Sequence, residues 1–180
     1  MQPDVGRLRA AARPVGDGSR WKVLSPAHMV VHSAVHGFHD GEMVNPLGDI
    51  LDIHQLVSEF TTRDSSFPNH LIEEGRRMGV QVPLGHALRA ATRWFGPMAP
   101  GFPEPGSLPS SARIVDACID AMVRRSVVPP RELGRSGAGL AMYMRSHWLK
   151  MPPLLLARHL TVKLLARRKE GARPDLVGRA

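Results

Sequence analysis

The chain has 180 residues and a formal net charge of +8, with 43% hydrophobic and 22% charged residues. This length and composition are typical of one globular domain with a buried core, and they exclude a disordered tail and a collagen-like fibre. Cys118 is the only cysteine, which excludes a disulfide scaffold. The sequence has no secretory signal, and no stretch approaches the roughly 20 apolar residues of a membrane span, so we expect a cytoplasmic protein.

The first part of the chain predicts a hairpin followed by four helices. Residues 1–24 are interrupted by glycine and proline and predict two short extended pieces around the turn Gly16–Ser19. Residues 25–96 predict a four-helix core, in which Ser25 and Asn45 are N-caps of the first two helices. Each helix has a proline at its start, where the missing N–H group costs nothing: Pro26, Pro46, Pro68 and Pro83.

The second part of the chain is expected to be helical after a linker. Residues 97–109 contain five prolines and predict a Pro/Gly linker. Residues 110–169 predict the C-terminal helices, and residues 170–180 a frayed tail. We therefore predict an all-α fold, a helical bundle of about six to seven helices with a short N-terminal β-hairpin remnant.

Four histidines of the first predicted core helix lie within twelve positions: His28, His32, His36 and His39. At 100° per residue they share an arc of about 80° beside the apolar stripe. Histidines four residues apart can share a metal ion, for which His28, His32 and His36 are candidates. Alternatively the histidines bind a phosphate or carboxylate anion. The structural alternative is that they are half-buried boundary residues hydrogen-bonded to neighbouring helices.

Two carboxylates follow on the next predicted helix. Asp49 and Asp52 are three residues apart and so share a helix face. Paired carboxylates can hold Mg²⁺ or act as acid and base. The structural alternative is a salt bridge to Arg76, Arg77 or Lys22. The candidate ligand or pocket residues are therefore His32, His36, His39, Asp49 and Asp52.

The end of the chain is basic. Its predicted last helix is amphipathic and could lie on an anionic membrane or on a partner, or it could close the bundle and expose its charges. Nucleic acid is not favoured as a partner, because an aromatic content of 5% offers few rings for base stacking. The candidate surface consists of Arg158, Lys163, Arg167, Arg168 and Lys169.

Several segments together resemble the uncharacterised nucleotidyltransferase family of the polymerase-β-like superfamily. The likeness covers roughly residues 12–100 and 143–165, and it includes the strand pair, the His-rich helix and the helices after it. The segments are Arg13–Val15, Trp21–Leu24, Leu24–His32 with Val35-His36, Leu47–Ile53, Leu71–Gly79, Pro83–Gly96 and Ser146–Leu154.

The resemblance implies a protein with two halves. An N-terminal α/β half binds a nucleoside triphosphate and Mg²⁺ through a Gly-Ser turn and an Asp-x-Asp pair, and a helical half shapes the acceptor site. This chain has no Asp-x-Asp, and Gly18-Ser19 is not followed by one. Asp49 and Asp52 cannot replace such a pair, because they are three apart on a helix.

We therefore expect a helical acceptor-side domain that is inactive alone, holds no cofactor of its own, and works with a missing N-terminal half or partner subunit. By the resemblance, the pocket or support positions are His32, His36, Asp49 and Asp52. The surface near residues 12–40 should then be unusually apolar. The alternatives are a non-enzymatic helical binding module with a histidine-rich face, or a basic protein that docks on a membrane or a partner.

Overall fold

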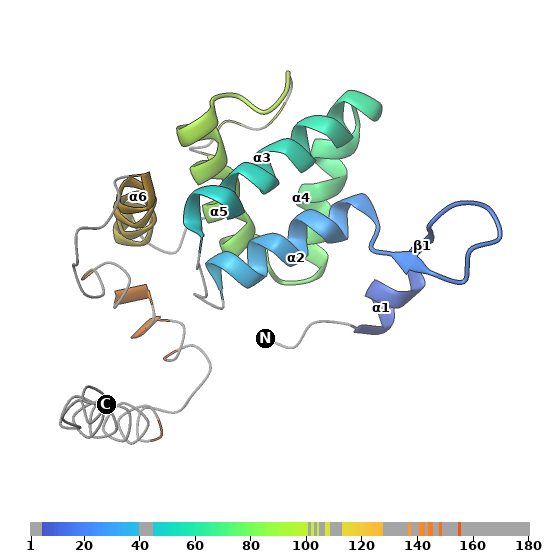
Figure 1. The fold of residues 1–180 in the computed structure, drawn as a ribbon, viewed down its shortest axis with the longest axis horizontal. Coiled ribbons are helices and arrows are strands. Elements are labelled where there is room, and N and C mark those ends of the chain that lie inside the picture. The colour runs from blue at the N-terminus through green and yellow to red at the C-terminus, as the bar shows by residue number, and fades with distance from the viewer. Residues whose placement is uncertain are drawn as a thin grey trace, which may run out of the picture.

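The computed structural model describes residues 5–39, 45–100, 102, 104, 107–108, 113–127, 137, 141–142, 144–145, 148 and 155. This part of the chain is all-α with one small hairpin, as predicted (Figure 1). The elements in chain order are α1 (Val5–Ala10), β1 (Arg13–Pro14), β2 (Lys22–Val23), α2 (Pro26–Phe38), α3 (Pro46–Arg63), α4 (Phe67–Arg77), α5 (Gln81–Phe95) and α6 (Arg113–Val127).

The N-terminal hairpin forms at the predicted place. Strands β1 and β2 pair antiparallel, with Arg13 opposite Val23. Gly16 and Gly18 have φ angles of +86° and +73°, so the turn uses the left-handed region that glycine enters without steric cost. Helix α1 was not predicted from the glycine- and proline-rich sequence. It is short, and Arg7 ties it to Glu74 in α4, a contact that sequence periodicity does not reveal.

The four core helices begin close to the predicted residues. Asn45 caps α3 as expected, since its side-chain oxygen accepts a hydrogen bond from the Gly48 N–H at 3.3 Å. Helix α5 begins two residues before Pro83, which therefore lies within its first turn. Helix α2 packs against α3, α4 and α5, and α3 also packs against α5 and α6.

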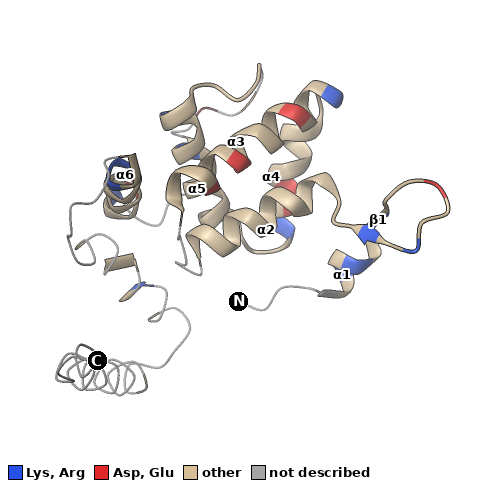
Figure 2. Ribbon diagram, viewed as in Figure 1, with Lys and Arg blue, Asp and Glu red and all other residues tan. Residues whose placement is uncertain are grey.

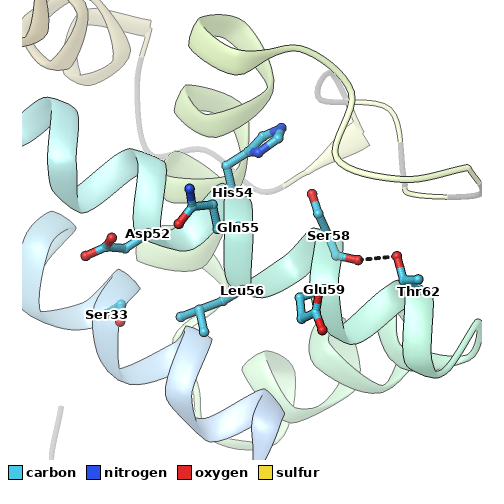
Figure 3. A pocket seen from close by; sticks show the side chains of 8 residues that line it. All are labelled: Ser33, Asp52, His54, Gln55, Leu56, Ser58, Glu59 and Thr62. Carbon is cyan, nitrogen blue, oxygen red and sulfur yellow. Dashed lines mark hydrogen bonds between the residues drawn. The ribbon is translucent and has the colours of Figure 1, made fainter.

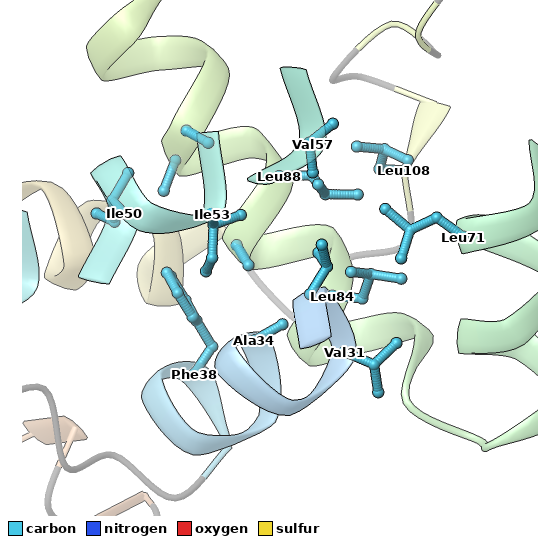
Figure 4. Packing of buried hydrophobic residues seen from close by; sticks show 14 of the residues in the cluster. Val31, Ala34, Phe38, Ile50, Ile53, Val57, Leu71, Leu84, Leu88 and Leu108 are labelled. Atoms are coloured by element: carbon cyan, nitrogen blue, oxygen red, sulfur yellow. The ribbon is translucent and has the colours of Figure 1, made fainter. Parts of the chain in front are cut away.

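The core lies where these helices meet (Figure 4). Phe38, Ile53 and Leu88 are fully buried there, and burying each such side chain contributes about 1.5–3 kcal/mol. Helices α4 and α5 approach closely at Gly75, because a Cβ atom at that position would lie 2.5 Å from Cδ2 of Leu84. The core therefore fixes the relative positions of the helices that carry the candidate site.

The predicted C-terminal helices fall mostly outside the described residues, as do the linker's middle and the whole basic surface. The residues of that surface are Arg158, Lys163, Arg167, Arg168 and Lys169. Among the described residues, no helix is long and apolar enough to cross a membrane.

Candidate functional site

The four histidines of α2 do not share one environment. His28 is only 2% exposed. His32 and His36 are exposed, and their rings stack with centroids 6.3 Å apart and planes 11° from parallel. His39 is half-buried at the end of the helix. The predicted histidine face therefore divides into a buried residue, an exposed pair and a boundary residue.

His28 belongs to a buried hydrogen-bond network. Its Nδ1 atom lies 2.9 Å from Ser25 Oγ, and its Nε2 atom lies 3.2 Å from Glu74 Oε2. Arg7 donates two hydrogen bonds to the same carboxylate, at 2.8 and 3.2 Å. Ser25 occupies the N-cap position of α2 as predicted, but its side chain makes no cap hydrogen bond. For His28, the observed environment matches the structural alternative.

The metal hypothesis finds no ligand set in the described part of the chain. No group of three or more His, Cys, Asp or Glu side chains there is arranged to hold a metal ion. His28 bonds Ser25 and Glu74, whereas His32 and His36 lie on the exposed side of the helix.

The exposed end of the histidine face and the two carboxylates of α3 lie on neighbouring helices, since α2 packs against α3. Asp49 is half-buried, and its pKa is raised, first by burial and then by the negative charge of Asp52. The charge of His36 acts in the opposite direction and lowers the pKa of Asp49. We define His36, Asp49 and Asp52 as the α2–α3 site. It unites residues from two helices and presents both donors and acceptors of hydrogen bonds.

Among the described residues, no ion pair joins Asp49 or Asp52 to Arg76, Arg77 or Lys22, so the structural alternative for these carboxylates is not observed there. Arg76 bonds Glu73, and Arg77 bonds both Glu73 and Glu74. The acidic neighbours on their own helix therefore occupy the two arginines, since residues three and four apart on a helix are adjacent. This leaves the carboxylates of Asp49 and Asp52 available on the α2–α3 surface.

An open hollow of about 850 Å³ continues from Asp52 along α3 (Figure 3). Asp52 and Leu56 point toward α2, where Ser33 lies, whereas His54 points to the other side of α3. Within the described structure, His54 Nε2 is a buried atom without a hydrogen-bond partner, and its ring lies 5.7 Å from that of Phe95. The hollow is large enough for a small molecule, and its mostly apolar lining surface also carries polar side chains such as those of Asp52 and Gln55.

Sequence reasoning missed a second buried network, which joins α5 to α6. His86 is fully buried, and its Nδ1 atom lies 2.6 Å from Asp116 Oδ1. Arg89 donates to the other carboxylate oxygen at 3.1 Å. Burial lowers the pKa of His86. The spacing of His86 and Arg89 is visible in the sequence, but their common partner is 30 residues away from His86, so only the packing reveals it.

The electrostatics of the α2–α3 site can be tested by titration. Replacing Asp52 with asparagine removes a negative charge beside Asp49, so we expect the pKa of Asp49 to fall. NMR titration of the side-chain carboxyl groups measures this shift. Glu59→Gln is the control, because Glu59 lies on the same helix about 15 Å from Asp49 along the axis. An Asp49 pKa that is unchanged by Asp52→Asn, or lowered equally by the control, would contradict the described geometry.

Comparison with known proteins relates the first part of the chain to a family model. Residues 1–96 match a family model described as an uncharacterised nucleotidyltransferase. No curated protein and no solved structure gives a significant match. The matched residues include α1, the hairpin and the four helices α2 to α5, and with them the whole α2–α3 site.

Proposed function

Because the chain belongs to the uncharacterised nucleotidyltransferase family, we propose that it is the acceptor-side helical domain of a nucleotidyltransferase. In such a reaction an acceptor atom attacks the α-phosphorus of a nucleoside triphosphate, and pyrophosphate leaves. In such enzymes carboxylates hold metal ions, and the metal ions stabilise this in-line displacement. The chain has no Asp-x-Asp pair to hold such metals, so we propose that it transfers nothing alone. A catalytic half with Mg²⁺ and the nucleotide supplies the chemistry.

The observation that supports the acceptor role is the electrostatic interaction of Asp49 with Asp52 on α3 and with His36 on α2. An imidazole N–H donates hydrogen bonds and a carboxylate accepts them, so together they suit an acceptor with hydroxyl or amine groups. The raised pKa of Asp49 brings its carboxyl closer to the range in which it exchanges a proton with such an acceptor. These residues position the acceptor rather than hold the metals of the reaction.

Apolar side chains on the hairpin support a partner surface. Val15 is 54% exposed, Trp21 is 69% exposed and Val23 is 42% exposed. A two-stranded hairpin is marginally stable by itself, and large apolar side chains gathered on one are typical of a surface that another unit covers. These exposed apolar side chains lie within residues 12–40, where we expect an unusually apolar surface. They are concentrated on the hairpin. We propose that the catalytic half packs there.

The acceptor role is tested in the presence of the catalytic half. The first step is to search the coding DNA before Met1, and neighbouring genes, for a segment with a Gly-Ser turn and an Asp-x-Asp pair. With that segment expressed together with the chain, we expect Asp49→Asn combined with Asp52→Asn to raise the KM for the acceptor about tenfold. The KM for the nucleotide should stay the same, since these residues do not touch it. Steady-state kinetics with each substrate varied in turn measures both constants.

The control is Glu104→Gln, which removes an exposed negative charge that is not one of the residues of the α2–α3 site. It should leave both KM values unchanged. A rise in the KM for the nucleotide, with the acceptor constant unaltered, would assign Asp49 and Asp52 to the nucleotide instead. Unchanged constants in the double variant would favour the alternative of a non-enzymatic binding module.

A further inference from the structure

A second cavity lies at the opposite end of α2, away from His36. Its volume is about 320 Å³. Its wall includes Arg13 of β1, Ser25 at the start of α2, Arg63 at the end of α3 and His70 of α4. Residues far apart in the sequence therefore converge on one space, which we call the corner cavity.

The corner cavity is lined by basic side chains from three elements. Basic positions lie on β1 and at the C-terminal end of α3 (Figure 2). In the described part of the chain, Arg13 makes no hydrogen bond or ion pair through its side chain, whereas Arg63 bonds the exposed Glu59. An arginine without a protein partner at a cavity wall retains all its donors for a ligand.

The one acidic residue of the wall is already engaged. Asp64 Oδ1 accepts hydrogen bonds from the Ser66 N–H at 2.9 Å and from the Ser66 hydroxyl at 2.6 Å. These bonds, first that from the Ser66 hydroxyl, lower the pKa of Asp64. Among the described residues its carboxylate makes no ion pair with Arg13 or Arg63. In the wall itself Arg13 and Arg63 face one carboxylate, that of Asp64, and Arg63 also pairs with Glu59. Among the described residues, Arg13 is therefore the arginine of this wall whose charge has no protein partner.

The start of α2 also lies at this wall. Ser25, 9% exposed, directs its hydroxyl to His28 instead of capping the helix. The first-turn N–H group of Ala27 therefore receives no cap hydrogen bond from Ser25, and Ala27 also lines the cavity. The positive end of a helix dipole favours an anion at this place.

We infer that the corner cavity binds a phosphate group carried by a small molecule. Arginine forks match the oxygens of phosphate, and two arginines with a histidine provide donors from separate directions. A volume of about 320 Å³ exceeds one phosphate ion, and it falls within the range of small-molecule sites. This inference stands on the cavity alone, and it holds whether or not the chain serves a nucleotidyltransferase.

The test measures binding of inorganic phosphate and glycerol 3-phosphate to the full chain by isothermal titration calorimetry. Ionic strength is held constant with chloride. We expect saturable binding of glycerol 3-phosphate, and a loss of affinity of about tenfold or more in the double variant Arg13→Gln, Arg63→Gln. The control Arg9→Gln, Arg125→Gln removes the same net charge at exposed positions outside the cavity. It should retain the wild-type affinity.

Circular dichroism verifies that each variant keeps the helical content of the wild type, and NMR chemical shifts locate the bound ligand. Shifts concentrated at Ser25, Ala27 and His70 would support the inference. Equal loss of affinity in both double variants would overturn it, because general charge would then explain the binding. The inference is also overturned by an absence of saturable binding, or by binding to phosphatidic acid vesicles without binding to glycerol 3-phosphate.

Discussion

Replacing Glu74 with alanine is expected to lower the free energy of unfolding by about 3 kcal/mol. The Glu74 side chain is only 5% exposed and pairs with Arg7, His28 and Arg77. Its removal leaves His28 Nε2 buried without a partner and releases α1 from α4. An unsatisfied buried polar group costs more than the hydrogen bond itself contributes. Urea denaturation followed by circular dichroism measures the change.

The control for Glu74 is its neighbour Glu73. That carboxylate also bonds arginines, Arg76 and Arg77, and its pKa is lowered to about 2. It lies on the surface, however, where ion pairs contribute little to stability. Glu73→Ala should therefore leave the urea midpoint nearly unchanged. Equal effects of the two substitutions would show that the Glu74 network is not buried in solution.

The same network predicts how stability depends on pH. Hydrogen bonds from Arg7, the largest cause, lower the pKa of Glu74 in the folded protein below its usual 4.5. The folded state then holds this carboxylate ionised more readily than the unfolded state does. The contribution of the Glu74 carboxylate to the free energy of unfolding is complete above its pKa in the unfolded state. This contribution is lost as the pH falls through its pKa in the folded state. Glu74→Ala should remove this part of the acid sensitivity.

The helix boundaries of the core could be predicted because their signals are local. Pro26 and Pro46 sit at helix starts, where proline is favoured whatever packs around it. Helix α1 has no such signal, and its Arg7 contacts a carboxylate 67 residues away. Ser25 shows the same limit. Its N-cap position follows from the sequence, but its hydroxyl turns to His28, which packing against α4 holds in place.

The candidate site was predicted in part. Helical rotation correctly placed His28 and His32 close together in angle, yet it did not reveal that one is buried and the other exposed. That difference depends on Glu74 of α4, which covers His28. The electrostatic effect of His36 on Asp49 likewise depends on how α2 packs against α3. Periodicity identifies the faces of single helices, and only tertiary packing brings two faces together.

The second large effect that we expect is the complete absence of transfer by the chain alone. In-line nucleotidyl transfer requires carboxylates that hold Mg²⁺ on both the attacking and the leaving oxygens. The sequence has no Asp-x-Asp, and the described residues contain no cluster of three or more potential metal ligands. Asp49 and Asp52 lie one helical turn apart on α3, so they suit an acceptor better than a pair of metal ions.

The most direct measurement is label transfer by the purified chain without a partner. The four nucleoside triphosphates, each labelled at the α-phosphate, are incubated with Mg²⁺ or Mn²⁺ and a cell extract depleted of proteins as the acceptor source. We predict no product above the level without protein, and recovery of transfer when the catalytic half is added. Metal-dependent transfer by the chain alone, abolished by Asp49→Asn combined with Asp52→Asn, would contradict the acceptor-side assignment and place catalysis on α3.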